Sequence, residues 1–357
     1  MTKRVIQFST GNVGRKALEI IIGRPDLELV GVHAAGPGKV SRDAAELCGL
    51  DTPTGVLATD DLDALVALGA DCVVYTNQAE TRPEQALAEV GAFLRAGTNV
   101  VGSSFVWLIN PRTADAWLRE PIEAACAAGG ASMYVNGIDP GYSGDTLALA
   151  ALSLVGRADS VRVQEIFDYG DYDDYDFTGV TFGFGSLPTD EPPLMFLPGV
   201  LASIWGGSVH LLAEAVGVEL DEVREFYEPW LTPTPIACVM TRVEPGAIAA
   251  VRFGVEGVVD GVPVIVVEHV NRLTPAAAPE WAYPPEGHLG VHRVVVEGSP
   301  GVEVNSHVGL GAIPETEAGV IATAARVVNA IDAVCDAPPG LLGLVDLPAS
   351  YAGRVVG

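Results

Sequence analysis

A glycine-containing turn close to the start of the chain constrains the fold more than any other feature of the sequence. Residues 5–10 read as a short β-strand, and residues 14–22 carry apolar side chains at the spacing of a helix. The connection between them matches the dinucleotide-binding pattern GxGxxG at its second and third glycines, with serine at the first position. Its residues are Ser9, Thr10, Gly11, Asn12, Val13 and Gly14. A strand, a turn and a helix in this order are typical of a nucleotide-binding α/β domain.

The composition of the turn suits a pyrophosphate. Gly11 would let the backbone approach the phosphates, and Gly14 would let the helix pack closely against the strand. The helix N-terminus supplies free N–H groups and the positive end of a dipole. We therefore expect the six residues of the turn to contact a cofactor; an ordinary glycine turn is the alternative.

Strands and helices alternate through the first part of the chain, and the pattern then changes. The alternation up to residue 140 implies right-handed βαβ crossovers and a parallel sheet. Beyond it come long β runs, including hairpins at 248–270 and 291–308, and an apolar helix at 201–216. The predicted fold class is α/β: a Rossmann-type parallel-sheet domain over residues 1–140, and a second α+β domain with a largely antiparallel sheet over residues 141–315.

Charge is distributed unevenly along the chain. It carries 20 basic and 46 acidic residues, a net charge of −26, which argues against nucleic acid or an anionic membrane as a partner. The first 42 residues nevertheless carry a net charge of +4 and all three lysines. A small anionic partner is therefore expected at this first segment.

The end of the second predicted strand favours NADP over NAD. NAD-preferring sites place Asp or Glu there to bind the ribose 2′-hydroxyl, but this strand ends with His33 and two alanines. The loop that follows carries Lys39, Ser41 and Arg42, two cations and a hydroxyl that suit a 2′-phosphate. We expect NADP as the cofactor; NAD is the alternative, with these residues as solvated loop charges.

Polar residues also follow later strands of the first domain. Because ligands bind at the carboxyl ends of parallel strands, these side chains are expected to flank the ribose and the nicotinamide. They are Tyr75, Thr76, Asn77, Ser103 and Ser104. Ordinary polar loop starts are the alternative.

Cysteines, histidines and apolar runs bear on compartment and metal binding. Five widely spaced cysteines without a CxxC motif indicate buried free thiols in a cytoplasmic protein. We expect neither a signal peptide nor a membrane span, because Gly, Pro or charge breaks the apolar runs. The six histidines form neither HExxH nor a Cys/His cluster, so no metal site is predicted.

Three features together give the chain a family resemblance. They are the glycine turn, the stretch Gly137-Ile138-Asp139-Pro140-Gly141 at the domain junction, and an ending that runs from Val327-Val328-Asn329-Ala330-Ile331 through Pro339-Gly340 to Asp346-Leu347-Pro348. With them the chain resembles the 2,4-diaminopentanoate dehydrogenase and native amine dehydrogenase family, whose Rossmann domain is like that of dihydrodipicolinate reductase.

The resemblance implies NAD(P)-dependent interconversion of amines and ketones, with ammonia as a reactant, an active site between domains and a homodimer. It also implies that the C-terminal helix and tail, residues 316–357, return to the first domain. In this family a glutamate just after one Rossmann strand assists ammonia addition. The corresponding residues 103–111 contain no carboxylate here, so either another acid serves or the reaction differs.

Candidates for the proton donor or base lie at the domain junction and on the strand predicted at 160–169. They are Asp139, Tyr142, Glu165 and Tyr169. On that strand Glu165 and Tyr169 face one way, and Ile166 and Asp168 face the other. A turn residue is the alternative role for Asp139. The stretch 165–177 interleaves six acids with five aromatics, which suits an amine by charge and cation–π attraction, or else forms a solvated loop.

Three functions remain open from the sequence. The first is an NADP-dependent amine dehydrogenase acting on a small, fairly apolar amine or ketone with ammonia. The second is an imine or carbonyl reductase that needs no ammonia, which the missing glutamate favours. The third is a non-catalytic NADP-binding protein.

Overall fold

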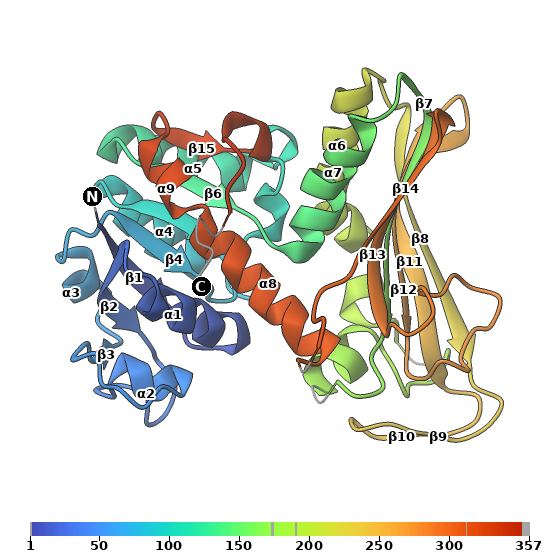
Figure 1. Ribbon diagram of the computed structural model, residues 1–357, viewed down its shortest axis with the longest axis horizontal. Helices are drawn as coiled ribbons and strands as arrows, with labels where there is room; N and C mark the ends of the chain where they lie inside the picture. Colours follow the sequence, from blue (N-terminus) through green and yellow to red (C-terminus); the bar gives the residue numbers. More distant parts are fainter. Residues whose placement is uncertain (1, 173–174, 190, 312, 352–357) are drawn as a thin grey trace. The chain divides into compact units, whose positions relative to one another are not determined.

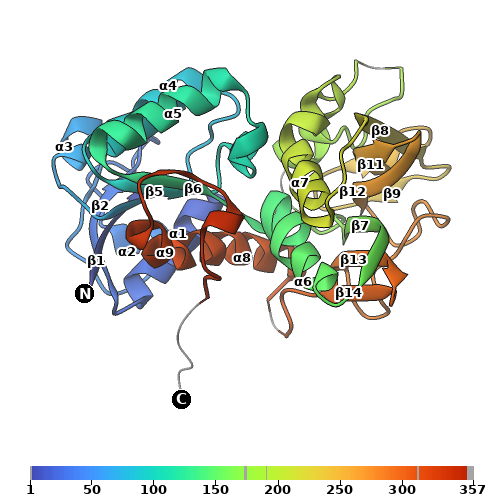
Figure 2. The ribbon, with the colours of Figure 1, turned by 90° about the horizontal axis from the view of Figure 1, so that it is seen from above.

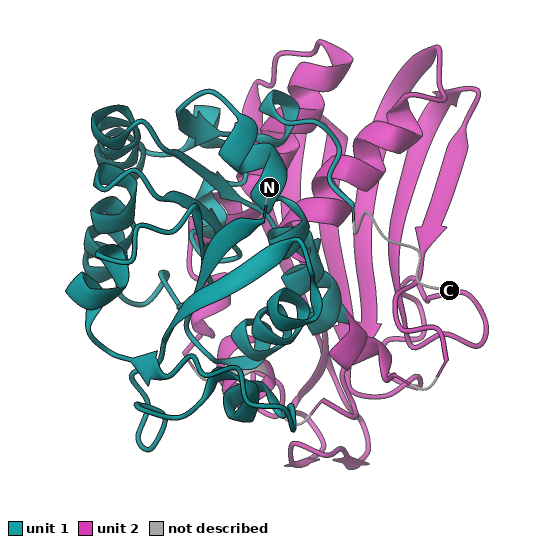
Figure 3. Ribbon diagram, turned by 60° about the vertical axis from the view of Figure 1, so that its left-hand side comes forward, with its two compact units in different colours: residues 1–138, 319–357 teal, residues 139–318 magenta. Residues whose placement is uncertain are grey.

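The computed structural model describes residues 2–172, 175–189, 191–311 and 313–351, which belong to two compact units. Unit 1 holds residues 1–138 and 319–357, and unit 2 holds residues 139–318 (Figure 3). From the sequence, the boundaries are expected at residues 140 and 315. Each unit has a sheet and a hydrophobic core of its own.

Unit 1 is built on a seven-stranded sheet whose adjacent strands all run parallel. The strand order is β15–β6–β5–β4–β1–β2–β3 (Figure 1). The strands are β1 (Lys3–Phe8), β2 (Leu27–His33), β3 (Ala58–Thr59), β4 (Cys72–Tyr75), β5 (Asn99–Gly102), β6 (Ser132–Val135) and β15 (Gly340–Leu342). The predicted Rossmann-type parallel sheet is thus confirmed.

Helices cover both faces of this sheet (Figure 2). The helices α4 (Pro83–Arg95) and α5 (Ala116–Gly129) pack Phe93 and Ile122 on one face, and α1 (Asn12–Gly23) packs Ile21 on the other. Each such fully buried side chain stabilises the unit by about 1.5–3 kcal/mol. The other helices of unit 1 are α2 (Ala44–Cys48), α3 (Leu62–Val66) and α9 (Ile331–Asp336), and α8 (Glu315–Asn329) begins in unit 2 and ends in unit 1.

The helical stretch Glu315–Asp336 is long and apolar enough to cross a membrane, by length and composition only. Core helices meet the same criterion, and Val327, Ile331 and Val334 are fully buried in the core of unit 1. This helical stretch therefore has a core-facing side, and it is interrupted at Ala330.

Unit 2 is built on a six-stranded sheet with the order β14–β13–β7–β12–β11–β8. Among its described strands only β7 and β12 pair in parallel, so the predicted largely antiparallel sheet is confirmed. The strands are β7 (Arg157–Asp168), β8 (Glu222–Leu231), β11 (Ile248–Val259), β12 (Val262–Arg272), β13 (Gly290–Ser299) and β14 (Val302–Ser306), beside a small hairpin of β9 (Ile236–Ala237) and β10 (Arg242–Val243). The helices α6 (Ala148–Leu152) and α7 (Val200–Val216) pack on one face of the sheet.

Several strands are not detected in the sequence, among them β3, β8 and β15. The strand β8 mixes charged with apolar residues and contains Pro229, and β15 spans only Gly340–Leu342. Proline is tolerated in β8 because this strand lies at the edge of its sheet. Short or irregular strands of this kind depend on tertiary pairing rather than on local periodicity.

A pair of leucine substitutions tests the packing of unit 1. Leu94 on α4 is fully buried, whereas Leu57 is 58% exposed. We expect Leu94→Ala to lower the free energy of unfolding by about 2–5 kcal/mol, and Leu57→Ala by less than about 0.5 kcal/mol. Urea unfolding followed by circular dichroism measures both values, and equal losses would contradict the described packing of α4.

Candidate active site

The glycine turn between β1 and α1 leaves no room for a side chain at Gly14, the third glycine position of the pattern. A Cβ on Gly14 would lie 2.3 Å from the carbonyl oxygen of Ser9 and 2.8 Å from Thr76 Oγ1. At Gly11 a Cβ would meet only Ser9 Oγ, at 3.9 Å, so the backbone there is open to a ligand. Ser9 has a φ of 84°, in the left-handed region that glycine adopts without strain.

Positive charge reaches the turn from a helix and from a lysine. The helix α1 begins at Asn12, so its free N–H groups and positive dipole end lie at the turn. Lys39 Nζ donates to the carbonyl oxygen of Thr10 at 3.1 Å and to Thr10 Oγ1 at 3.2 Å. The residues present therefore fit the pyrophosphate of a dinucleotide, with open backbone at Gly11 and a cation beside it.

The end of β2 carries an aromatic platform rather than a carboxylate. The His33 imidazole stacks on Phe8 with ring centroids 3.9 Å apart. Its Nδ1 is buried and has no hydrogen-bond partner among the described residues. Burial, together with the positive charge of Arg82, lowers the pKa of His33, so the ring is neutral at neutral pH.

The three residues expected to hold a 2′-phosphate are placed differently from one another. Lys39 is held at the glycine turn, as described above. Ser41 is exposed, and Arg42 forms an exposed ion pair with Glu46 at 3.0 Å. Lys39 is therefore close to the expected position of the pyrophosphate, and Arg42 would have to release Glu46 in order to bind a 2′-phosphate.

The later strand ends bring some of the expected residues to the turn. Thr76 Oγ1 donates to the Phe8 carbonyl at 3.1 Å and lies against Gly14. Asn77 and Ser103 are half-buried, and Ser104 is buried. The Tyr75 hydroxyl instead donates to Glu89 at 2.6 Å inside the core, which favours a packing role for this side chain.

One carboxylate that the sequence does not single out lies beside residues 103–111. Glu80 accepts a hydrogen bond from the backbone N–H of Val106 at 3.3 Å and another from that of Ala79 at 3.0 Å. Glu80 and Val106 are 26 residues apart, so no local pattern links them. Both carboxylate oxygens of Glu80 are thereby engaged by backbone groups.

In unit 2 the strand register places three ionisable side chains in one row across the sheet. Glu165 on β7 pairs in register with His269 on β12 and with His292 on β13. Both histidines are buried, at 2% and 1% exposed. The predicted parity of Glu165 and Tyr169 is confirmed, because the Tyr169 hydroxyl donates to Glu165 Oε1 at 3.4 Å.

Asp139 lies over this row and has both carboxylate oxygens engaged. Its Oδ2 is hydrogen-bonded to His269 Nε2, and its Oδ1 accepts from Trp205 Nε1 at 3.1 Å. The side chains of Asp139 and His269 are 4% and 3% exposed. Glu165 accepts from Asn271 Nδ2 at 3.4 Å and is also hydrogen-bonded to Asp139, so the two carboxyl groups share one network.

Burial and neighbouring charges shift the pKa values of the network's members in different directions. Burial opposes charge on His269, but Asp139 and Glu165 outweigh it and raise the pKa of His269. Burial likewise opposes charge on Asp139, but His269 lowers its pKa. Burial and the nearby Asp139 raise the pKa of Glu165 to about 8, and burial lowers the pKa of His292 to about 4. At neutral pH the network therefore holds an Asp139–His269 ion pair, a protonated Glu165 and a neutral His292.

The same network bears on the expectation that the protein has no metal site. One potential ligand atom from each of Asp139, Glu165 and His269 lies within 4.8 Å of the others. However, the carboxylate of Asp139 and the imidazole of His269 bind each other, so the cluster is a hydrogen-bonded network as it stands.

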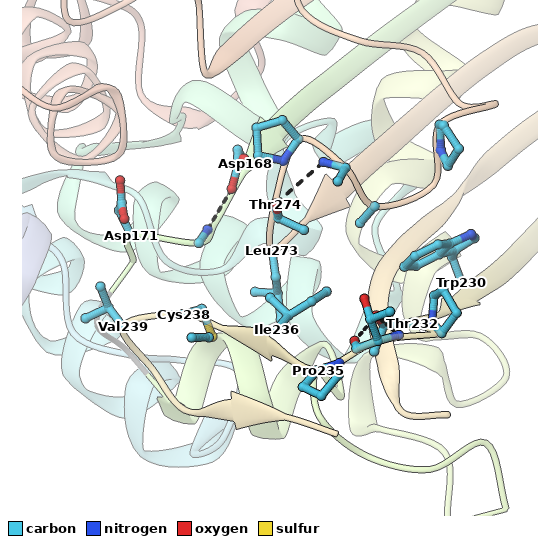
Figure 4. Close-up of a pocket in the computed structure, with 18 of the residues that line it drawn as sticks. Asp168, Asp171, Trp230, Thr232, Pro235, Ile236, Cys238, Val239, Leu273 and Thr274 are labelled. Carbon is cyan, nitrogen blue, oxygen red and sulfur yellow. Dashed lines mark hydrogen bonds between the residues drawn. The ribbon is translucent and has the colours of Figure 1, made fainter. Parts of the chain in front are cut away.

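The remaining predicted residues of unit 2 lie around the network or apart from it. The Tyr142 hydroxyl is 3.0 Å from Ser306 Oγ, and Ser306 pairs in register with His292. Asp168 and Asp171, from the acid-rich stretch, line a pocket of about 960 Å³ opposite Trp230 and Thr232 (Figure 4). Residues 173 and 174 of that stretch lie outside the described residues.

Sequence reasoning missed the histidines, the tryptophan and the asparagine of the network. His269 and Asp139 are 130 residues apart, and the register of β7 with β12 is what places His269 beside Glu165. The alternation of β12 offered the only signal, because His269 and Asn271 share one face of that strand.

Comparisons with known proteins agree with one another. Residues 204–354 match the family described as the 2,4-diaminopentanoate dehydrogenase C-terminal domain. The chain is 41% identical to an amine dehydrogenase of Streptomyces virginiae over 98% of both chains. It is 25% identical to 2,4-diaminopentanoate dehydrogenase of Acetoanaerobium sticklandii, over 98% of this chain and 94% of that protein. The structure of an amine dehydrogenase from Mycobacterium smegmatis has the same fold, with a TM-score of 0.75 at 18% identity over 98% of this chain and 97% of that one.

Two glycine substitutions test the geometry of the turn. An added Cβ collides with backbone at Gly14, whereas at Gly11 it has room and the φ of −74° suits any residue. We expect Gly14→Ala to lower the free energy of unfolding by about 1–3 kcal/mol and Gly11→Ala to lower it by less. Urea unfolding measures both, and a larger loss for Gly11→Ala would contradict the described turn.

Proposed function

The chain belongs to the amine dehydrogenase family and is an oxidoreductase acting on CH–NH2 groups. We propose that it uses NADP to interconvert small apolar amines and the corresponding ketones or aldehydes, with ammonia as a reactant. The observation that carries the cofactor part of this proposal is the glycine turn of unit 1. Gly14 excludes a side chain there, and Gly11 leaves backbone open beside Lys39. When bound, the nicotinamide supplies or accepts the hydride.

The preference for NADP over NAD rests on charge at two places. No carboxylate stands at the end of β2, where NAD-preferring sites hold the ribose 2′-hydroxyl. Lys39 and Arg42 supply cations in the loop that follows β2, and the ion pair between Arg42 and Glu46 is exposed and weak enough to exchange. His33 offers a neutral ring face and an unpartnered Nδ1 at the same strand end.

The substrate side of the proposal rests on the network in unit 2 and the rings around it. Trp205 and Phe253 lie 4.3 Å and 4.7 Å, centroid to centroid, from the His269 ring. Aromatic rings next to buried ionisable groups suit a substrate with an apolar body and one nitrogen or oxygen function. The candidates for proton handling are Asp139, Tyr142, Glu165 and Tyr169.

A second candidate function is reduction of imines or carbonyl compounds without ammonia. The absence of a carboxylate from residues 103–111 favours it, because the family's acid for ammonia addition is missing there. We further propose that the protein is a homodimer in the cytoplasm. Its five cysteines, all among the described residues, are free thiols, which supports a reducing compartment.

Cofactor affinities test the assignment of NADP. We expect NADPH to bind more tightly than NADH, and Lys39→Ala to weaken NADPH binding by about 10-fold, because a charge-assisted hydrogen bond contributes about 1.5–3 kcal/mol. Fluorescence titration measures the dissociation constants. Lys3→Ala, which removes the same charge at the other end of β1, serves as the control. Tighter NADH binding that Lys39→Ala leaves unchanged would contradict the assignment.

Ammonium dependence separates the two candidate reactions. NADPH oxidation with a cyclic ketone should require ammonium and yield the amine if the protein is an amine dehydrogenase. Absorbance at the nicotinamide band and chromatography of the product give rate and identity. An equal rate without ammonium, with the alcohol as product, would favour the carbonyl reductase.

A further inference from the structure

Unit 2 contains a half-buried acid, Glu165, whereas residues 103–111 of unit 1 contain no carboxylate. The geometry points to Glu165 as the group that donates and accepts protons in the reaction, with Asp139 and His269 as positioning residues. This inference rests on the proposed function, and it places the proton donor in unit 2.

Asp139 is fixed by its partners and is not itself free to exchange protons. Trp205 Nε1 binds one of its oxygens and His269 Nε2 binds the other. Both side chains of the ion pair are nearly fully buried. Asp139 therefore acts as a fixed negative charge next to Glu165.

Glu165 is the carboxyl group that such a charge keeps protonated. Two carboxyl groups in one buried site do not both ionise, because like charges repel strongly where water is scarce. On the other side of Glu165, His292 is neutral and adds no compensating charge. The groups that face Glu165 are Asp139, His269, His292, Tyr169 and Asn271. Glu165 is itself only partly buried, so a proton can pass between it and a substrate.

In each turnover of reductive amination, Glu165 gives up one proton and regains one. Ammonia attacks the carbonyl carbon, and one of its protons passes to the carbonyl oxygen to give a carbinolamine. Protonated Glu165 then gives its proton to the carbinolamine hydroxyl, the C–O bond breaks, water leaves and the nitrogen lone pair forms the C=N bond. Addition of the hydride to that carbon gives the amine. The Glu165 carboxylate left at the end of each turnover takes a proton from ammonium, which restores protonated Glu165 and supplies the next ammonia. The sum is ketone, ammonium and NADPH to amine, NADP⁺ and water.

Glu80 is the rival acid, because its carboxylate lies beside residues 103–111. Its two oxygens already accept from the backbone N–H groups of Ala79 and Val106, which gives it a structural role in that loop. Among the described residues no backbone N–H donates to the Glu165 carboxyl group in this way, and its hydrogen bonds to Tyr169 and Asn271 are long, at 3.4 Å.

Matched carboxamide variants decide between these acids. We expect Glu165→Gln to lower kcat about 100-fold or more in both directions, with the dissociation constant of NADPH unchanged. Glu80→Gln should change kcat only a few-fold. The control is Glu256→Gln, which removes an ion-paired carboxylate on the opposite face of the same sheet. A loss in Glu80→Gln as large as that in Glu165→Gln, or full activity of Glu165→Gln, would overturn the assignment.

The pH profile gives a readout that a merely structural role would not move. Reduction needs protonated Glu165 and should fall as pH rises through about 8, whereas amine oxidation needs the carboxylate and should rise over the same range. Asp139→Asn removes the negative charge next to Glu165, so the fall in the reduction rate and the rise in the oxidation rate should both occur at lower pH. Rate changes that stay at the wild-type pH in Asp139→Asn would contradict the positioning role.

Infrared spectroscopy of the NADP-bound protein separates this inference from the proposed function. A protonated-carboxyl band that disappears between pH 6 and pH 10, and that Glu165→Gln lacks, supports the inference even if the substrates are carbonyl compounds reduced without ammonium. Absence of that band from the wild type would overturn it. Activity lost on dialysis against a chelator and restored by one equivalent of a divalent cation would overturn it in favour of a metal site at Asp139, Glu165 and His269.

Discussion

A negative charge buried inside a sheet domain needs a positive partner, and in unit 2 the Asp139–His269 pair meets this requirement. The pair joins the first residue of the unit to β12, and Trp205 adds α7 through its indole N–H. Leaving one charge of such a pair alone costs about 3–5 kcal/mol. These three elements therefore hold one another in place, and the environment of Glu165 follows from them.

In unit 1 the comparable constraint is steric and acts through the backbone. Gly14 fits against the Ser9 carbonyl, and the buried Gln7 side chain donates to that same carbonyl at 2.8 Å and to Thr76 Oγ1 at 2.9 Å. These contacts hold Ser9 in a conformation that serine alone would not choose. The turn is thus shaped by contacts within the protein, which lowers the entropic cost of binding a ligand there.

The parts of the protein that could be predicted from sequence are those set by local pattern. Alternating strands and helices, the glycine turn and the parity of Glu165 with Tyr169 each need only a few neighbouring residues. His269 could not be assigned, because it meets Glu165 only through the register of two parallel strands far apart in sequence, and its partner Asp139 is 130 residues away. Glu80 could not be assigned either, because its partner Val106 is 26 residues away in sequence. The edge strand β8 could not be predicted because it lacks the periodicity of a half-buried strand. The sequence predicts Tyr75 at the cofactor, but its hydroxyl donates to Glu89 in the core. A position at the end of a strand does not by itself determine whether a side chain faces a ligand or the core.

The two units have separate hydrophobic cores, and this bears on how such a chain diversifies. Substitutions around Lys39 act on one core and substitutions around Glu165 act on the other, so their effects on stability should add rather than interfere. Under the proposed function, coenzyme choice and working pH then become independently heritable traits. A descendant could change either one without first repairing the fold that supports the other.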